Sequence, residues 1–226
     1  MGKNIKLTAS DSFQLNAYVA EPASPAKAGV VIIQEIFGIN QHIRSVVDRF
    51  AKEGYLAVAP ALFDRVRPGI ELSYNPSTMK EGFGYVTALD QKNTIADIDA
   101  AISWLRAQPG IKKVGAVGFC WGGTLAFLTN ARLNVDASVS YYGGGIQFYL
   151  EEKPKSPSMY HFGGKDDHIK QDVWDAVRAA VPGAPVYVYD NAGHAFNRDV
   201  DPNVYVPDAA KLAMDGTLQL LHANLD

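Results

Sequence analysis

The chain has very little cysteine. Cys120 is the only one among 226 residues, so the chain cannot form a disulfide within itself. It also has no excess of basic residues, because 21 Lys and Arg stand against 24 Asp and Glu, for a formal net charge of −3. Nucleic acids and anionic membrane surfaces are bound by basic faces. We therefore expect neither as a partner.

Long apolar runs are absent as well. No run approaches the roughly 20 residues that cross a bilayer. The first residues, MGKN, lead straight into a strand pattern without the apolar core of a signal peptide. We expect a soluble protein of a reducing compartment, most simply the cytoplasm. The oligomeric state is left open.

What the chain does have is enough apolar sequence for a sizeable core, at 47% hydrophobic residues. A length of 226 residues is long for one small domain and short for two, which favours one compact domain with a large sheet. No internal repeat, low-complexity tract or linker marks a boundary. The prediction is a single domain over residues 1–226.

Strand and helix patterns alternate after an initial hairpin. Apolar and polar residues alternate at 5–9 and 13–19 around a Ser-Asp-Ser turn, as in an edge hairpin. Further strands are predicted at 29–33, 55–59, 114–118, 135–142, 158–162 and 185–189. Helices are predicted from the cap at Asn40 to Gly54, and at 95–105, 124–132, 173–177 and 207–223. This order predicts an α/β fold with a mostly parallel sheet of about eight strands and helices on both faces.

Residues 60–89 show no clean period and carry several prolines and glycines. A stretch of that length inside a compact domain is usually functional or mobile. We predict a loop with short helical pieces that closes over a site.

The segment around Cys120 has the spacing of a nucleophile elbow. Gly118-Phe119-Cys120-Trp121-Gly122 matches G-x-S-x-G with sulfur in place of hydroxyl, between a predicted strand and a predicted helix. Such a turn strains the central residue and raises its side chain above the sheet edge, where the helix N-terminus favours negative charge. The alternative is a lone buried cysteine that acts as a small hydrophobe.

Two further residues follow predicted strands in the order that α/β-hydrolases use. Asp166 is the first acid in the loop after strand 158–162, and His194 lies in the loop after strand 185–189. Asp166 could also be a turn residue and His194 an ordinary loop histidine. Both readings would have to produce this order and these positions by accident.

These residue types fit hydrolysis through a thiol. A thiol is mostly protonated at neutral pH, so an imidazole must take its proton or hold it in an ion pair. Asp166 would orient His194. The tetrahedral intermediate needs two donors for its oxyanion, for which the backbone N–H groups of Trp121 and Ile36 are the candidates.

Five segments together resemble the dienelactone hydrolase (carboxymethylenebutenolidase) family, an α/β-hydrolase family, in register from about Gly29 to Phe196. They are QEIFG at 34–38, GFCWGG at 118–123, YYG at 141–143, GGKD at 163–166 and AGHAF at 192–196. The resemblance implies that Cys120 is the nucleophile, His194 the base and Asp166 its orienting acid. It makes Glu35 a carboxylate near the thiol, although Glu35 could instead only brace its loop. It implies a thioester formed from a small ester or lactone, without metal or organic cofactor.

The resemblance also implies how a substrate is held. Arg198 matches a position that binds the substrate carboxylate, although it could pair with Asp199 or Asp201 instead. Apolar walls are expected from Phe37, Trp121 and Tyr142. No arginine stands near Met79-Lys80, where the family enzyme that opens dienelactones has one, and Trp121 replaces a smaller residue. These two departures leave open whether dienelactone itself is the substrate, but they do not affect the expected hydrolase chemistry. Lys80, Arg65 and Arg67 are the candidates for a second cation.

Two other functions compete with hydrolysis. A metal site could gather His161, Asp166, Asp167, His168 and His194, but no H-E-x-x-H or paired-cysteine spacing supports it. An α/β-hydrolase scaffold that binds a small ligand without turnover is the second alternative, because fold alone does not establish activity. The Cys120, Asp166 and His194 set argues for the enzyme.

Overall fold

The structure is a computed structural model and describes residues 2–226. Its strands are β1 (Lys3–Thr8), β2 (Gln14–Ala20), β3 (Ala28–Ile33), β4 (Leu56–Pro60), β5 (Lys113–Phe119), β6 (Ala137–Tyr141), β7 (Ser158–Gly163) and β8 (Val186–Tyr189). Its α-helices are α1 (Gln41–Lys52), α2 (Pro76–Ala88), α3 (Gln91–Arg106), α4 (Trp121–Arg132), α5 (Gln171–Ala180) and α6 (Pro207–Leu225), with short 3₁₀ helices η1 (Leu62–Arg65) and η2 (Ile146–Tyr149).

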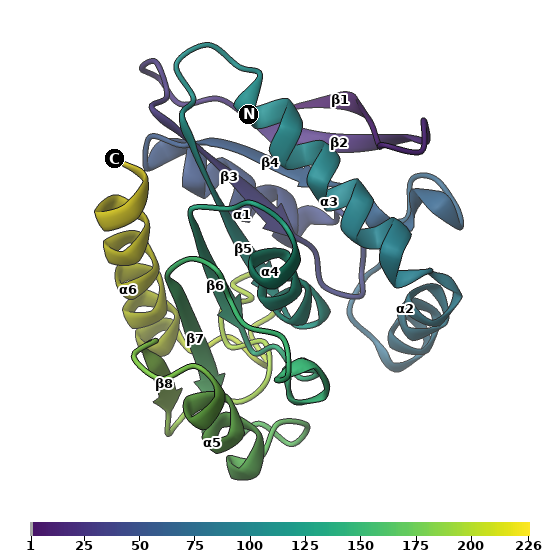
Figure 1. The fold of residues 1–226 in the computed structure, drawn as a ribbon. Helices are drawn as coiled ribbons and strands as arrows, with labels where there is room; N and C mark the ends of the chain where they lie inside the picture. The colour runs from purple at the N-terminus through teal and green to yellow at the C-terminus, as the bar shows by residue number, and fades with distance from the viewer. Residues whose placement is uncertain (1) are drawn as a thin grey trace. The chain divides into compact units, whose positions relative to one another are not determined.

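The eight strands follow the order β1-β2-β4-β3-β5-β6-β7-β8 (Figure 1). Strand β2 is antiparallel to β1 and β4, whereas the pairs β3–β4, β6–β7 and β7–β8 are parallel. The predicted α/β fold, with a mostly parallel sheet and an N-terminal antiparallel hairpin, is confirmed.

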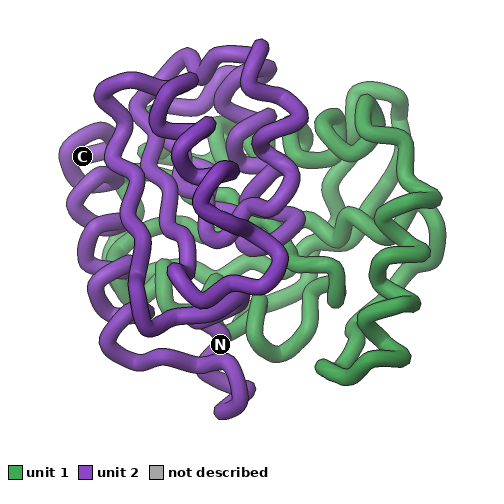
Figure 2. Tube along the Cα trace, turned by 90° about the horizontal axis from the view of Figure 1, so that it is seen from below, with its two compact units in different colours: residues 1–115 green, residues 116–226 purple. Residues whose placement is uncertain are grey.

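Contacts divide the chain into two compact units, residues 1–115 and 116–226 (Figure 2), and each is described by itself below. The single domain over residues 1–226 stays a prediction.

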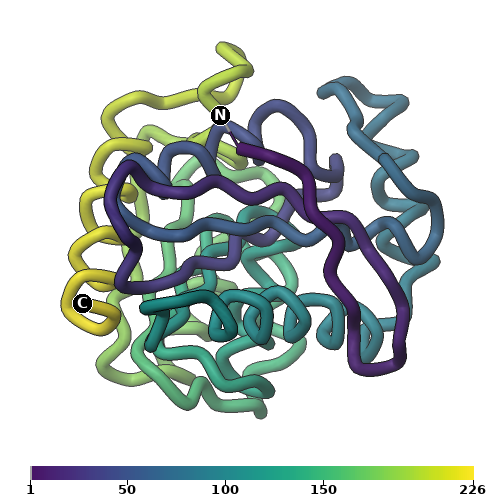
Figure 3. Tube along the Cα trace, turned by 90° about the horizontal axis from the view of Figure 1, so that it is seen from above, coloured from purple at the N-terminus to yellow at the C-terminus, as the bar shows by residue number. Residues whose placement is uncertain are grey.

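In the first unit the hairpin pairs Lys3 with Val19 through Thr8 with Gln14, and it is the purple loop in Figure 3. All six residues of β3 and all five of β4 are buried, which explains their unbroken apolar sequences. Helix α1 begins as predicted, because the Asn40 side chain accepts a hydrogen bond from the Ile43 N–H. Helix α3 lies in front of these strands in Figure 1, and α1 lies behind them.

The prediction for residues 60–89 is wrong in one respect. Besides η1, the segment contains a 13-residue helix, α2, and not only short helical pieces. Asn75 and Thr78 form a capping box at its start, and Pro76 occupies the first turn, where a missing N–H costs nothing. Gly82 is its only buried residue, so α2 has no apolar stripe that a sequence pattern could detect.

In the second unit α4, α5 and α6 pack on β6, β7 and β8. The largest buried side chains here are aromatic, and they include Tyr141, Tyr142, Tyr160 and Phe196. Helix α4 starts at Trp121, three residues earlier than predicted, so that strand β5 and the helix are separated by Cys120 alone. Among the described residues, no helix is both long and apolar enough to cross a membrane.

Candidate active site

The turn at Cys120 is strained, as the elbow spacing predicts. Its φ of 56° and ψ of −120° lie in a region that costs a residue with a side chain on the order of 1–3 kcal/mol. The Cys120 N–H donates to the Tyr141 carbonyl at 3.0 Å, which ties the turn to the end of β6. The thiol is half-buried, rather than raised fully into solvent.

The glycines around Cys120 are required by close packing. A Cβ on Gly118 would overlap the Gly122 carbonyl, and a Cβ on Gly123 would lie 2.6 Å from the Tyr141 carbonyl oxygen. Real Cβ atoms do not approach that closely, so only glycine fits at both positions. Strand β5 can therefore turn directly into α4, which leaves Cys120 at the N-terminus of the helix, where the helix dipole favours an anion.

Asp166 and His194 lie on the loops that follow β7 and β8. The His194 ring donates from Nδ1 to Asp166 Oδ2 at 2.7 Å. The other Asp166 oxygen accepts the backbone N–H groups of His168 at 2.8 Å and Ile169 at 3.2 Å. The two loops are also joined through their backbones, because the Lys165 N–H donates to the Ala192 carbonyl at 2.8 Å. The side chain of Asp166 is fully buried and that of His194 is 24% exposed.

Charge and hydrogen bonding connect His194 to Cys120. Burial lowers the pKa of His194, but the charge of the Cys120 sulfur, hydrogen bonds to Asp166 and Cys120, and the Asp166 charge together raise it to about 10. Burial raises the pKa of Asp166, but the His194 bond and charge and the two backbone N–H groups hold it below its usual value. His194 therefore links the other two residues, since it bonds Asp166 and lies beside the Cys120 sulfur, and both neighbours favour a cationic imidazole.

The neighbouring aspartate has a different environment. The Asp167 side chain is 94% exposed and pairs with Lys170 at 3.3 Å. The exposed His168, which the sequence suggested only as a metal ligand, has its ring 5.6 Å from that of His194, edge to face. The sequence does not predict that His168 lies beside His194, because this loop has no periodic pattern. The contact depends on the turn in which Asp166 accepts the His168 N–H.

The predicted substrate-binding residues of the second unit are buried. Tyr142 has no exposed surface and packs its ring 5.1 Å from that of His194. Arg198 is 7% exposed, and its Nη1 lies 3.6 Å from Asp201 Oδ2. This is the pairing that was considered as an alternative, although it is buried and not on the surface. Trp121 is the first residue of α4, at a position whose N–H has no acceptor within its own helix.

In the first unit the loop after β3 carries Glu35, Ile36 and Phe37, all buried. The Gln34 side chain donates to the Glu35 carbonyl at 3.2 Å, and Phe37 packs edge to face on Tyr74 at 4.8 Å. No hydrogen bond donated by the Ile36 N–H is found among the described residues, so this donor is available to a ligand.

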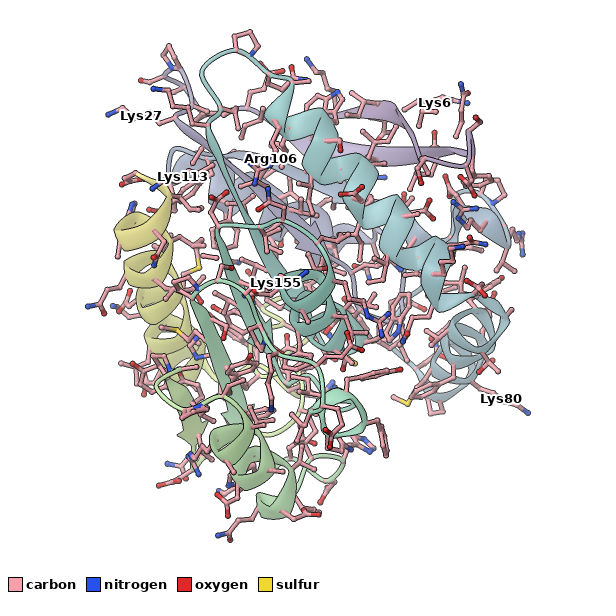
Figure 4. The ribbon with its side chains drawn as sticks, viewed as in Figure 1. Lys6, Lys27, Lys80, Arg106, Lys113 and Lys155 are labelled. Carbon is pink, nitrogen blue, oxygen red and sulfur yellow. The ribbon has the colours of Figure 1, made fainter. Side chains whose placement is uncertain are left out.

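The three cations of residues 60–89 differ in their environments. Arg65 binds Asp97 and Asp11 through two hydrogen bonds each and is not available to a substrate. Arg67 is exposed, and Lys80 points away from α2 (Figure 4).

The residues suggested as metal ligands do not form a set of metal ligands. His161 is buried, and it bonds Tyr189 at 2.9 Å and Thr217 at 3.2 Å instead of facing His194. Within residues 2–226, no group of three or more His, Cys, Asp or Glu side chains is arranged to hold a metal ion.

Comparisons with known proteins place the chain in a family. The model of the dienelactone hydrolase family matches residues 15–225. The carboxymethylenebutenolidase of Pseudomonas putida is 36% identical over 226 residues, which cover 97% of this chain and 95% of that protein. Carboxymethylenebutenolidase 1 of Cupriavidus pinatubonensis is 32% identical over 228 residues, which cover 98% and 97%.

Solved structures give the same result. A Klebsiella pneumoniae protein named as a dienelactone hydrolase superimposes with a TM-score of 0.83 at 30% identity, covering 98% of this chain and 99% of that one. The Pyrococcus furiosus esterase Pf2001, with a TM-score of 0.71 at 15% identity and coverage of 100% and 93%, shares the fold. By sequence along almost its whole length and by fold, this chain belongs to the dienelactone hydrolase family and is a hydrolase of carboxylic esters or lactones.

Proposed function

We propose that the chain hydrolyses a small ester or lactone through a thioester on Cys120, with His194 as base and Asp166 as its orienting acid. The observation that supports this most is the position of His194, which bonds Asp166 at 2.7 Å and lies beside the Cys120 sulfur, with all three residues placed just after strand ends. Asp166 occupies Nδ1 of His194 and leaves Nε2 for the sulfur.

In the first half of the reaction the Cys120 thiolate attacks the acyl carbon. A C–S bond forms while the carbonyl π electrons move to oxygen, and His194 holds the proton at Nε2. The oxyanion then collapses and breaks the ester C–O bond. The leaving alkoxide takes the proton from His194. A lactone is opened in the same way, with its alkoxide remaining on the acyl group.

Water completes the reaction. The neutral His194 removes a proton from water, and the water oxygen bonds to the thioester carbon. Collapse of this second intermediate breaks the C–S bond and releases the carboxylic acid. The thiolate and the imidazolium are restored. Every proton and bond in these steps is accounted for by Cys120, His194, the substrate and water.

The oxyanion of both intermediates needs donors. We assign them to the N–H groups of Trp121 and Ile36, since the first opens α4 and the second is available among the described residues. Phe37 and Tyr142 would form apolar walls around a small acyl group.

We also propose that Glu35 is an active-site carboxylate close to the Cys120 thiol. Its complete burial fits a functional carboxylate, because a charged side chain is rarely buried without a specific role or partner. The alternative is that it only braces its loop. Glu35→Gln should shift the pH dependence of Cys120 alkylation by iodoacetamide, and an unchanged profile would favour bracing.

A substrate with a carboxylate is proposed from Arg198. Asp201 competes for the same guanidinium at 3.6 Å, so a substrate would have to share or displace it. This finer assignment is separable from the hydrolase chemistry, and its test is given in the Discussion.

A burst experiment separates a turning-over enzyme from a scaffold that only binds. Mixed with an activated aryl ester, the wild type should release one leaving group per Cys120 and then turn over, whereas Cys120→Ala should show neither. Cys120→Ser should lose most activity, because a hydroxyl starts from a much higher pKa than a thiol. Wild-type turnover by Cys120→Ala would show that another residue is the nucleophile.

A further inference from the structure

The loop that carries Ile36 is held by a distant stretch of the first unit. We call residues 34–40 the Ile36 loop and residues 62–82 the clamp segment. At the start of the loop, the Leu62 N–H donates to Gln34 Oε1 at 3.1 Å. In its middle, the Leu72 N–H donates to the Phe37 carbonyl at 2.8 Å, and Gly38 forms a β-bridge with Glu71.

The end of the loop is bound to the same segment. The Asn40 side chain donates to the Leu72 carbonyl at 3.1 Å and to the Tyr74 hydroxyl at 2.9 Å. The Tyr74 ring also packs on Phe37. The clamp segment thus contacts the Ile36 loop at both ends and in the middle, through one backbone–backbone hydrogen bond at Phe37 and through the side chains of Gln34 and Asn40.

Helix α2 approaches Ile36 itself. A Cβ on Gly82 would overlap the Ile36 carbonyl oxygen, and it would lie 3.1 Å from the carbonyl carbon and 3.3 Å from the Ile36 Cβ. Gly84, two residues further along the same helix, has nothing within 4 Å of such a Cβ. A glycine inside a helix is unfavourable relative to alanine. The close approach of Ile36 explains why residue 82 is a glycine despite this cost.

We propose that the clamp segment sets the backbone conformation at Ile36, and that Gly82 is a positioning residue for the reaction because it lets α2 rest against the Ile36 carbonyl, across one Cα from the Ile36 N–H. The inference depends on the proposed function, in which the Ile36 N–H donates to the oxyanion. The proposal also explains how the clamp segment is held in place although it has little apolar pattern. Helix capping, hydrogen bonds to the Ile36 loop and the Gly82 contact hold it.

The expected effect falls on the transition state. A donor to the oxyanion is worth most when the charge is fully developed, and complete loss of one donor costs roughly 10²–10³ in kcat. A methyl group on residue 82 must push the Ile36 carbonyl or the helix aside by more than a few tenths of an ångström, and a rotation of the backbone at Ile36 would redirect its N–H. We expect Gly82→Ala to lower kcat for p-nitrophenyl acetate by at least about tenfold, with KM within about threefold of wild type.

Gly84→Ala is the matched control. It adds the same methyl group to the same helix and gives the same gain in helix propensity, but it meets no atom. Its kcat and KM should stay within about twofold of wild type. Equal kcat for the two alanine variants would overturn the proposal. A rise in KM with kcat unchanged would overturn it too, because it would assign the segment to substrate binding.

A milder variant covers the case in which Gly82→Ala does not fold. Tyr74→Phe keeps the ring on Phe37 but removes the hydroxyl that accepts from Asn40. It should lower kcat by about two- to fivefold at constant KM, since one bond between the clamp segment and the loop is lost. Wild-type kcat for Tyr74→Phe, with no folded Gly82→Ala, would overturn the inference.

One further measurement distinguishes failure of this inference from failure of the proposed function. Alkylation of Cys120 by iodoacetamide needs no oxyanion donor, so its rate should be the same in Gly82→Ala and in wild type. An altered alkylation rate in Gly82→Ala would mean that the substitution acts on the thiol and would overturn the positioning role. A wrong nucleophile assignment would instead show in the burst experiment, where Cys120→Ala would still turn over the ester.

Discussion

Two adjacent aspartates, Asp166 and Asp167, lie in opposite environments. One is buried and accepts from His194 and two backbone N–H groups, and the other is almost fully exposed. A neutral amide at position 166 cannot stabilise the imidazolium and can favour the wrong tautomer. Asp166→Asn should therefore lower kcat by at least about 100-fold, whereas Asp167→Asn should change it only a few-fold. Steady-state kinetics on one aryl ester suffices for both.

The aspartate comparison also controls for folding, because both changes remove one negative charge from the same loop. If Asp167→Asn were the more damaging of the two, the orienting acid would have to be moved by one residue. If neither variant lost activity, the orienting role itself would be wrong.

Arg198 supports a second prediction at the scale of single residues. Its side chain is buried, and its Nη1 lies 3.6 Å from the Asp201 carboxylate. If it also holds a substrate carboxylate, Arg198→Ala should raise KM for lactones that carry a carboxylate by roughly tenfold or more, the loss of one charge-assisted bond. Neutral aryl esters should be nearly unaffected.

The comparison of charged and neutral substrates decides between the two roles of Arg198. Equal losses on both kinds would mean that the Asp201 pair only supports the loop that carries His194. In that case the preference for anionic substrates should be abandoned, while the hydrolase chemistry would stand.

At the scale of elements, one side chain joins three segments of the first unit. Arg65 of η1 binds Asp97 of α3 through two bonds of 2.8 Å, and Asp11 of the β1–β2 turn through bonds of 2.7 and 3.1 Å. The two carboxylates differ, since Asp97 is fully buried and Asp11 is 43% exposed. Burial raises the pKa of Asp97, whereas the Arg65 hydrogen bond lowers the pKa of Asp11 to about 2.

This link gives a stability prediction. Removal of one partner of a buried ion pair costs about 3 kcal/mol or more, so Asp97→Asn should lower the free energy of unfolding by about that amount. Asp11→Asn should lower it far less, because water screens an exposed pair. Urea denaturation of both variants measures the difference. Equal losses would mean that burial of Asp97 does not determine the strength of the link.

At the scale of the whole molecule, the His194 environment makes stability depend on pH. The folded pKa of His194 is raised to about 10, above the ordinary value of 6.5, so the folded chain holds a proton that the unfolded chain releases. This contribution is complete below pH 6.5 and is lost as the pH rises towards 10. The pKa of Asp166 is lowered, so its contribution is present above pH 3.8 and is lost as the pH falls below that value.

We therefore expect maximum stability between about pH 4 and 6.5, from thermal unfolding measured across buffers. His194→Gln should remove most of the decline above pH 6.5. Cys120→Ala should reduce that decline, because the charge of the sulfur is the largest contribution that raises the pKa of His194. If stability above pH 6.5 declined as much in both variants as in the wild type, titration of other groups would be responsible for the decline.

The sequence by itself determined the order of elements and most of the candidate site. Apolar periods located the eight strands, and Asn40 located the start of α1, because these signals are local. The spacing around Cys120 located the elbow for the same reason, since the close approaches at Gly118 and Gly123 arise within one strand, one turn and one helix.

Only the tertiary structure decided what depends on contacts between distant segments. Helix α2 has no apolar stripe to predict it, and the reason for Gly82 appears only where Ile36 rests on it. The same holds for Arg198, whose sequence position allows a surface pair or a substrate contact, while its burial beside Asp201 is set by folding. Burial, partners and pKa are properties of the assembled neighbourhood, so no local pattern could have given the environment of these residues.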